Sequence, residues 1–248
     1  MNYQYILFDL DGTLTDPKVG ITKSVAYALD KMNIEVVDYS KLDLFIGPPL
    51  KESFQEYYDL NEHEANEAIE YYRERFQQHG LYENEVYPGI ETLLEILKKK
   101  GKILAVATSK PTIFAKKILQ HFNLAQYFDV IVGSNLDGTR IAKADVIHEV
   151  LLQLSSPDKN EVIMIGDRKH DLIGAQKECI ANIGVLYGYG SKEELVLEEP
   201  TYIVSNIEEL DTILTNKHMK THGKSSMRFH VFIRQLLLQN VEVNSPEY

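Results

Sequence analysis

Six short apolar runs rich in β-branched residues recur along the chain, and they constrain its fold more than any other feature. They are YQYILFDL, KILAVATS, FDVIVGS, EVIMIGD, NIGVLYG and TYIVS. Between most of them lie amphipathic segments of helical length, at residues 89–101, 111–122, 142–154 and 169–180. Strands that alternate with helices pair in parallel through right-handed crossovers. The sequence therefore predicts an α/β fold with a doubly wound parallel sheet.

One long segment, residues 17–85, interrupts this alternation because it contains no convincing strand. The stretches ITKSVAYALDKMN, LKESFQEYYDL and EHEANEAIEYYRERFQQHG have the spacing of three or more amphipathic helices. We therefore predict a core domain of residues 1–16 and 86–216 and an inserted helical cap of residues 17–85. We expect the cap to cover the carboxyl edge of the sheet, where ligands bind in open α/β folds.

Composition limits the kinds of partner. The formal net charge of −11 argues against non-specific nucleic-acid binding, which needs a basic surface. No run approaches transmembrane length and no basic-then-apolar leader is present, so we expect a cytoplasmic protein that does not enter membranes. Residues 217–248 differ from the rest, with five basic residues against two acidic ones. We interpret this basic extension as a tail that is loosely attached or docks on the core. The alternative is a segment that binds a partner or an anionic membrane surface.

The first strand ends in two carboxylates, Asp9 and Asp11, followed by Gly12. Positions i and i+2 of a strand point to the same side, so both carboxylates can address one site. Such a pair can divide the work of nucleophile or metal ligand and of proton donor. The alternative is an ordinary Asp-Gly turn at the end of a strand.

Two other segments carry groups suited to an anion. Thr108 and Ser109 follow an apolar strand and are expected at the start of the next helix, where hydroxyl and amide donors suit a phosphate oxygen. Lys143 is expected at or near another helix start, where a lysine opposes the helix dipole and is therefore unusual. Taken singly, these residues are equally consistent with a helix cap and a solvated surface lysine.

A fourth strand end adds two acids, Asp167 and Asp171. If these meet Asp9 at one edge of the sheet, the carboxylates repel one another unless a divalent cation lies between them. Oxygen ligands beside a phosphoryl group favour Mg²⁺. The four segments together predict a phosphoryl-transfer site at the carboxyl edge of the sheet.

These residues resemble the motifs of the haloacid dehalogenase superfamily, in its branch with a helical cap after the first strand. The resemblance covers about residues 3–215. It rests on DLDGT (9–13), on Thr108 in VATSKP, on Lys143 and on GDRKHD (166–171). The stretches IGPPL (46–50) and GVLYGYGS (184–191) are similar to stretches in phosphoglycolate phosphatase-like and 5′-nucleotidase-like members.

The resemblance implies a Rossmann-like core and a Mg²⁺-dependent phosphatase. Asp9 is then the nucleophile that forms an aspartyl-phosphate, and Asp11 is the acid and later the base. Mg²⁺ is expected on the Asp9 carboxylate, the backbone carbonyl of Asp11 and Asp167, with Asp171 acting indirectly or through water. Thr108, the Ser109 amide and Lys143 are expected to neutralise the phosphoryl oxygens.

The cap loop FIGPPLKE (45–52) is expected to point into the site, with Ile46, Pro48 and Lys51 as candidate substrate contacts. Its two prolines are equally consistent with a simple break between two cap helices.

Several alternatives stay open at this point. A dehalogenase of the same superfamily is disfavoured, because it does not need the acid Asp11. A phosphonatase would use a cap lysine such as Lys51 to form a Schiff base, and a sugar-phosphate mutase would share all the core residues. A non-catalytic binding or regulatory module is the alternative outside enzymes. Phosphoglycolate, a nucleoside monophosphate and a small sugar phosphate are all possible substrates, and the sequence does not distinguish a monomer from a homodimer.

Overall fold

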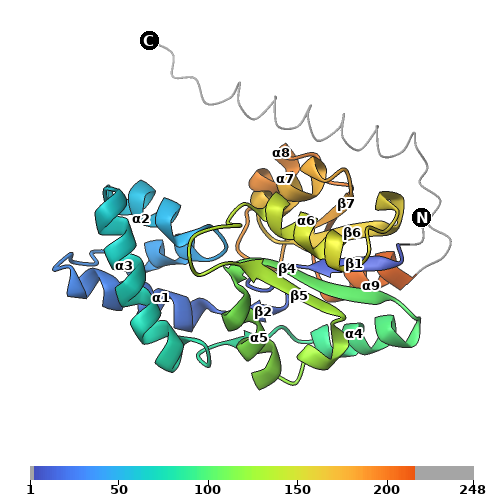
Figure 1. Cartoon of the computed structure of the whole chain (residues 1–248), viewed down its shortest axis with the longest axis horizontal. Helices are drawn as coiled ribbons and strands as arrows, with labels where there is room; N and C mark the ends of the chain where they lie inside the picture. Colours follow the sequence, from blue (N-terminus) through green and yellow to red (C-terminus); the bar gives the residue numbers. More distant parts are fainter. Residues whose placement is uncertain (1–2, 216–248) are drawn as a thin grey trace, which may run out of the picture. The chain divides into compact units, whose positions relative to one another are not determined.

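The computed structural model describes residues 3–215, and its centre is a six-stranded sheet (Figure 1). Its strands stand in the order β5-β4-β1-β6-β7-β8, and every neighbouring pair is parallel. All six apolar runs supply a strand, which confirms the predicted doubly wound sheet. The strands are β1 (Tyr5–Phe8), β4 (Ile103–Pro111), β5 (Val130–Ser134), β6 (Val162–Gly166), β7 (Ala181–Val185) and β8 (Tyr202–Val204).

The two faces of the sheet bury alternate residues of each strand. In β1, Ile6 and Phe8 pack on the side of α4 (Ile90–Lys99), α5 (Thr112–His121) and α9 (Ile207–Thr215). Leu7 packs on the opposite side, against α6 (Lys143–Gln153) and α7 (Lys169–Lys177). Because both faces are covered, the strands are apolar throughout and the strand ends are where polar residues begin.

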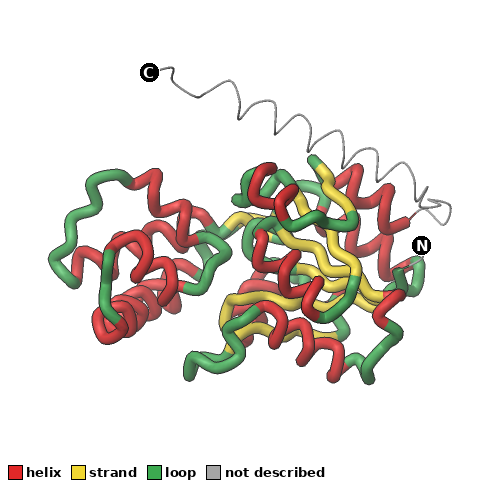
Figure 2. Tube along the Cα trace, turned by 90° about the horizontal axis from the view of Figure 1, so that it is seen from above, coloured by secondary structure: helices red, strands yellow, loops and turns green. Residues whose placement is uncertain are grey.

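The segment between β2 (Thr15–Asp16) and β3 (Glu85–Val86) is helical. These two short strands pair antiparallel, so the chain leaves the core and returns to it at one place. Between them lie α1 (Lys18–Lys31), α2 (Leu50–Tyr58) and α3 (Glu62–Arg75), with a 3₁₀-helix η1 (Tyr39–Phe45) and a π-helix η2 (Phe76–Gly80). Figure 2 shows these helices grouped to one side of the sheet. We call this helical segment the cap.

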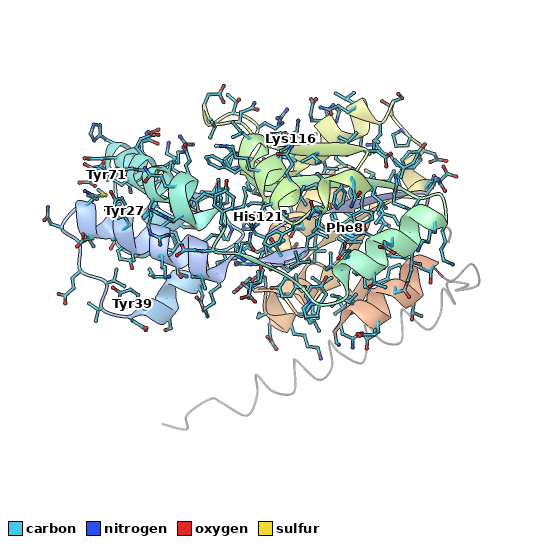
Figure 3. The ribbon with its side chains drawn as sticks, turned by 90° about the horizontal axis from the view of Figure 1, so that it is seen from below. Phe8, Tyr27, Tyr39, Tyr71, Lys116 and His121 are labelled. Atoms are coloured by element: carbon cyan, nitrogen blue, oxygen red, sulfur yellow. The ribbon has the colours of Figure 1, made fainter. Side chains whose placement is uncertain are left out.

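The cap has its own apolar interior. Phe45 lies edge-on to Phe54 with ring centroids 4.9 Å apart, and both side chains are buried. Helix α3 begins with a capping box, in which Asn61 and Glu64 satisfy one another's backbone N–H groups. On the outer surface, Tyr27 of α1 lies near Tyr71 of α3, far from Phe8 of the core (Figure 3).

Three local features differ from the sequence-based expectations. Strand β4 continues to Pro111, where it pairs with Ser134, so Thr108 and Ser109 lie within the strand and not at the start of a helix. Helix α8 (Lys192–Leu197), capped by Ser191, was not expected. Two further 3₁₀ turns, η3 (Ala125–Tyr127) and η4 (Lys159–Glu161), precede β5 and β6.

The last helix begins at a capping side chain. Asn206 accepts a hydrogen bond from the Glu209 N–H at 2.9 Å. Within residues 3–215, no helix combines the length and apolarity needed to cross a bilayer. The predicted basic extension, residues 217–248, lies outside the described residues.

Candidate active site

Asp9 stands at the carboxyl end of the central strand β1. Its backbone N–H donates to the Ile165 carbonyl at 2.8 Å, which continues the pairing of β1 with β6. Its carboxylate oxygen Oδ1 accepts from the Leu10 N–H at 2.8 Å and lies 3.0 Å from the Lys143 ammonium. Both contacts engage the same oxygen, so they fix the orientation of this carboxylate.

Lys143 is the first residue of α6, as predicted, and it is buried. Its ammonium lies 2.8 Å from Asp171 Oδ1 and donates to the Ala107 carbonyl at 3.2 Å, in addition to its contact with Asp9. Burial opposes the charge of this group, but the carboxylates of Asp171 and Asp9 outweigh that effect and raise the pKa of Lys143. The lysine is therefore a fixed cation at the strand ends.

Asp167 follows β6 and is fully buried. The chain approaches it closely, because a Cβ on Gly12 would lie 2.1 Å from Asp167 Oδ2 and one on Gly188 would lie 2.3 Å from Asp167 Cβ. Its carboxylate accepts from the Tyr189 N–H at 2.8 Å and from the Thr13 hydroxyl at 3.4 Å.

Burial and then the neighbouring carboxylates raise the pKa values of both acids at this edge. The pKa of Asp167 lies well above its usual range through desolvation, Asp171 and Asp9. Desolvation and Asp9 raise the pKa of Asp171 to about 7. Desolvation is the largest cause of both shifts, and repulsion between the carboxylates adds to it.

These three acids form a cluster that could hold a cation. Asp9, Asp167 and Asp171 each offer one carboxylate oxygen, and these oxygens all lie within 4.8 Å of one another. Asp9 and Asp167 were expected to meet here. Asp171, for which an indirect role was expected, lies as near as the other two.

Asp11 lies on the other side of the site, against a lysine that the sequence analysis missed. Lys110 Nζ is 2.8 Å from Asp11 Oδ2, with the two side chains 5% and 10% exposed. Burial raises the pKa of Asp11, although Lys110 works in the opposite direction. Lys110 is two residues after Thr108 in β4, so strand alternation was the signal that could have placed its side chain at the same edge.

Of the three predicted phosphate-binding residues, Ser109 lines two cavities. One of about 80 Å³ lies between the cap and the core, and its lining includes Asp11, Pro48, Tyr72, Phe76, Ser109 and Lys110. The second, about 320 Å³, is lined by Ser109 and Lys143 together with Glu52, His170 and Lys177. Thr108 lines neither cavity; it is buried, and its hydroxyl accepts from the Lys110 N–H at 3.2 Å.

The cap loop supplies only part of what was expected. Pro48 lines the smaller cavity. The side chain of Ile46 is buried in the apolar interior. Its backbone carbonyl accepts a hydrogen bond from Arg168 at 2.6 Å. Lys51 lies 2.6 Å from Glu62 within the cap and lines neither cavity, so the structure does not bring its side chain to the site. The ammonium of Lys51 pairs with Glu62 instead.

The fold and site define an α/β protein with a buried carboxylate cluster at the carboxyl edge of its sheet and a helical cap beside it. Residues 6–185 match the family described as haloacid dehalogenase-like hydrolase, and the chain belongs to this family. The expected resemblance and fold are thus confirmed.

The chain is similar to several named proteins. The chain is 48% identical to a 5′-nucleotidase of Pseudomonas aeruginosa over 86% of its own length and 96% of the relative. It is 38% identical to the tyrosine-protein kinase PtkA of Mycobacterium tuberculosis over 85% of its own length and 71% of that protein. The crystal structure of a predicted phosphatase from Clostridium acetobutylicum matches 86% of this chain and 99% of that one, with 54% identity and a TM-score of 0.84.

Proposed function

We propose that this protein is a Mg²⁺-dependent phosphatase that hydrolyses a small phosphomonoester through an aspartyl-phosphate on Asp9. The observation that carries this proposal is the buried cluster in which four carboxylates and two lysines meet at the sheet edge. Phosphoryl transfer is catalysed mainly by positioning and by charge stabilisation. Fixed cations beside a held carboxylate are the groups that such a reaction needs.

Asp9 is the proposed nucleophile. Its carboxylate is oriented by Leu10 and Lys143, so one oxygen can attack phosphorus while the P–O bond to the leaving alkoxide breaks. Lys143 at the start of α6, with Thr108 and the Ser109 amide at the end of β4, would stabilise the charge on the phosphoryl oxygens.

Asp11 is the proposed acid and base. It lines the smaller cavity between cap and core, and burial raises its pKa, which favours the protonated form. Protonated Asp11 would give its proton to the leaving oxygen. The resulting carboxylate would then take a proton from the water that attacks the phosphorus of the Asp9 phosphate.

The acids at the sheet edge fit a hard divalent cation. The Asp9 carboxylate, Asp167 and the Asp11 backbone carbonyl would hold Mg²⁺, with Asp171 acting on it less directly. The fit is supported by the close grouping of carboxylate oxygens and by the pKa of Asp167, which desolvation and the carboxylates of Asp171 and Asp9 raise. Bound there, the ion would neutralise the carboxylates and the charge on the phosphoryl group.

The relative named 5′-nucleotidase supports testing nucleoside monophosphates first, followed by phosphoglycolate and small sugar phosphates. The position of Lys51 argues against a phosphonatase, because this cap lysine, which would form the Schiff base, lines neither cavity. The relative named tyrosine-protein kinase makes a second candidate of transfer of the terminal phosphoryl group of a nucleoside triphosphate, by way of Asp9, to a tyrosine hydroxyl, with the nucleoside diphosphate as the leaving group. The small cavity beneath the cap favours a small leaving group instead.

Turnover of p-nitrophenyl phosphate and of a phosphorylated-metabolite panel, with Mg²⁺ and after EDTA treatment, tests the proposal. We expect release of inorganic phosphate, and a fall of about 10³-fold or more in kcat for Asp9→Asn, because the nucleophile is lost. EDTA should abolish turnover and excess Mg²⁺ restore it. Activity that survives both changes would refute the mechanism. In a parallel assay with a nucleoside triphosphate and a tyrosine-containing peptide, phosphotyrosine without inorganic phosphate would favour the kinase.

A further inference from the structure

Lys110 is given no step of its own in the hydrolysis proposed above, yet its side chain is buried. Its ammonium pairs with Asp11 Oδ2 on one side, at 2.8 Å. On another side it lies 4.4 Å from the centre of the Phe76 ring. A buried ammonium requires compensating partners. Here one partner belongs to the core and the other to the cap.

Phe76 is held firmly where it meets Lys110. It is the first residue of the π-helix η2, an uncommon element that occurs often at functional sites. Its ring stacks on Tyr72 at 5.1 Å and lies edge-on to Phe114 of α5 at 5.8 Å. The aromatic face over Lys110 is therefore supplied by the cap and braced against the core.

The two oxygens of Asp11 differ in their surroundings. Oδ2 is engaged by Lys110, whereas Oδ1 is buried and has no hydrogen-bond partner among the described residues. Asp11 itself lines the cavity that also contains Lys110 and Phe76. An ion pair at one oxygen prevents the carboxyl from rotating and leaves the other oxygen for the leaving group.

We infer that Lys110 is a positioning residue, which holds Asp11 so that Oδ1 serves the leaving oxygen, and that Phe76 of the cap keeps Lys110 in place. This assignment rests on the proposed phosphatase activity. The cap would then contribute to catalysis as well as cover the site. Loss of the Phe76 ring would let Lys110 move, and Asp11 would move with it.

If Lys110 positions Asp11, its loss should affect some substrates more than others, which a purely structural role would not do. An alkoxide needs a proton as it leaves, whereas p-nitrophenolate is stable enough to leave without one. Removing Lys110 should therefore harm alkyl phosphates much more than p-nitrophenyl phosphate. A role in folding alone would lower turnover of both by the same factor.

The test compares kcat/KM for p-nitrophenyl phosphate and for the best alkyl phosphate of the metabolite panel, with Mg²⁺ present, because kcat/KM depends only on the steps up to release of the leaving group and not on the later step in which Asp11 acts as a base. For Lys110→Met we expect kcat/KM to fall about 30- to 100-fold with the alkyl phosphate and by about threefold or less with p-nitrophenyl phosphate. Lys110→Arg should recover most of the loss because it restores the cation. Equal losses on both substrates, or no loss on either, would overturn the assignment.

The contribution of the cap is tested with Phe76→Leu, for which we expect the same selective loss at about 3- to 10-fold. Phe54→Leu is the matched control, since Phe54 is an equally buried cap aromatic that packs on Phe45. It should show no selectivity between substrates. If Phe76 acts through Lys110, the double variant should lose no more than Lys110→Met alone, and multiplied losses would overturn this part.

Wild-type protein separates the two levels of failure. If it turns over neither substrate with Mg²⁺, the phosphatase proposal itself is refuted, and the role of Lys110 with it. If the wild type is active but Lys110→Met is unselective, only the positioning role is lost. Thermal unfolding of each variant identifies a loss that comes from misfolding, and Lys110→Arg and Phe76→Leu keep the test decisive if Lys110→Met does not fold.

Discussion

The described residues contain two contrasting clusters of charged side chains, one at the sheet edge and one in the cap. At the sheet edge, four carboxylates share two ammonium groups, and all six residues are buried: Asp9, Asp11, Lys110, Lys143, Asp167 and Asp171. In the cap, Glu83 alone meets both Arg75 and Lys23, with side-chain exposures of 26%, 17% and 57%. The sheet-edge cluster is buried and has more negative than positive groups. The cap cluster is partly exposed and has more positive than negative groups.

This difference distinguishes a charge cluster suited to binding a cation or a substrate from one that only forms partly exposed ion pairs. Burying carboxylates without full compensation costs stability, as the raised pKa values of Asp167 and Asp171 show. Such a cost is typical of sites that bind a cation or a substrate. Partly exposed ion pairs contribute little to stability and need no ligand.

The largest expected effect is that of Asp167→Asn, which should damage activity while stabilising the metal-free protein. The change removes a carboxylate that Asp9 and Asp171 repel, and the amide oxygen can still accept from the Tyr189 N–H. We expect kcat with Mg²⁺ to fall about 10³-fold, since a proposed metal ligand is lost. The free energy of unfolding in EDTA should rise by about 1–2 kcal/mol.

Thermal unfolding with and without Mg²⁺ provides the control for this variant. Excess Mg²⁺ should raise the Tm of the wild type, because it binds only the folded state, and should leave the Tm of Asp167→Asn nearly unchanged. A variant that is less stable than the wild type in EDTA would contradict the view that the sheet-edge cluster is under electrostatic strain.

A smaller effect is expected from the pH dependence of the metal-free protein, through Asp171. Its pKa is raised to about 7 in the folded state, against about 3.9 in an unfolded chain. The folded state therefore binds more protons between these values, so this group makes stability fall as pH rises from about 4 to about 7. Asp171→Asn should lose that component, which is measured as the difference in Tm between pH 5 and pH 7.5 after removal of metal. An unchanged difference would contradict the prediction.

The sequence was sufficient to predict the sheet and the acidic residues at its edge. Alternation of apolar runs with helices predicted every strand of the six-stranded sheet. The end of each run showed where polar side chains begin. Asp9 and Asp167 could be expected to meet because β1 and β6 are parallel and both end at one edge. These inferences depend on local periodicity and on a general rule of sheet topology.

Other features depend on contacts that local patterns do not contain. The extension of β4 past Thr108 relies on the pairing of Pro111 with Ser134. Lys51 was expected in the site, but its charge is engaged by Glu62, a residue from another cap helix. Helical periodicity through residue 80 gives no sign of the π-helix that begins at Phe76. Pro111 and Ser134 pair across neighbouring strands, and Lys51 and Glu62 lie 11 residues apart, so local periodicity indicates neither contact.

The smallest expected effect comes from the cap, where Glu83→Gln removes the carboxylate that Arg75 holds through both oxygens, at 2.8 and 3.1 Å. We expect unchanged kcat and a loss of about 1 kcal/mol or less in the free energy of unfolding at neutral pH. High salt should reduce this loss, because partly exposed pairs are screened.

The pH dependence of Glu83→Gln should have the opposite sign to that of Asp171→Asn. Hydrogen bonds from Arg75, opposed by partial burial, lower the pKa of Glu83 in the folded state. Its contribution is therefore present above the unfolded pKa of about 4.3 and is lost as pH falls through the lower folded value. Wild-type minus variant stability should rise with pH for Glu83 and fall with pH for Asp171. If both differences had the same sign, the contrast between a compensated and an uncompensated cluster would not hold.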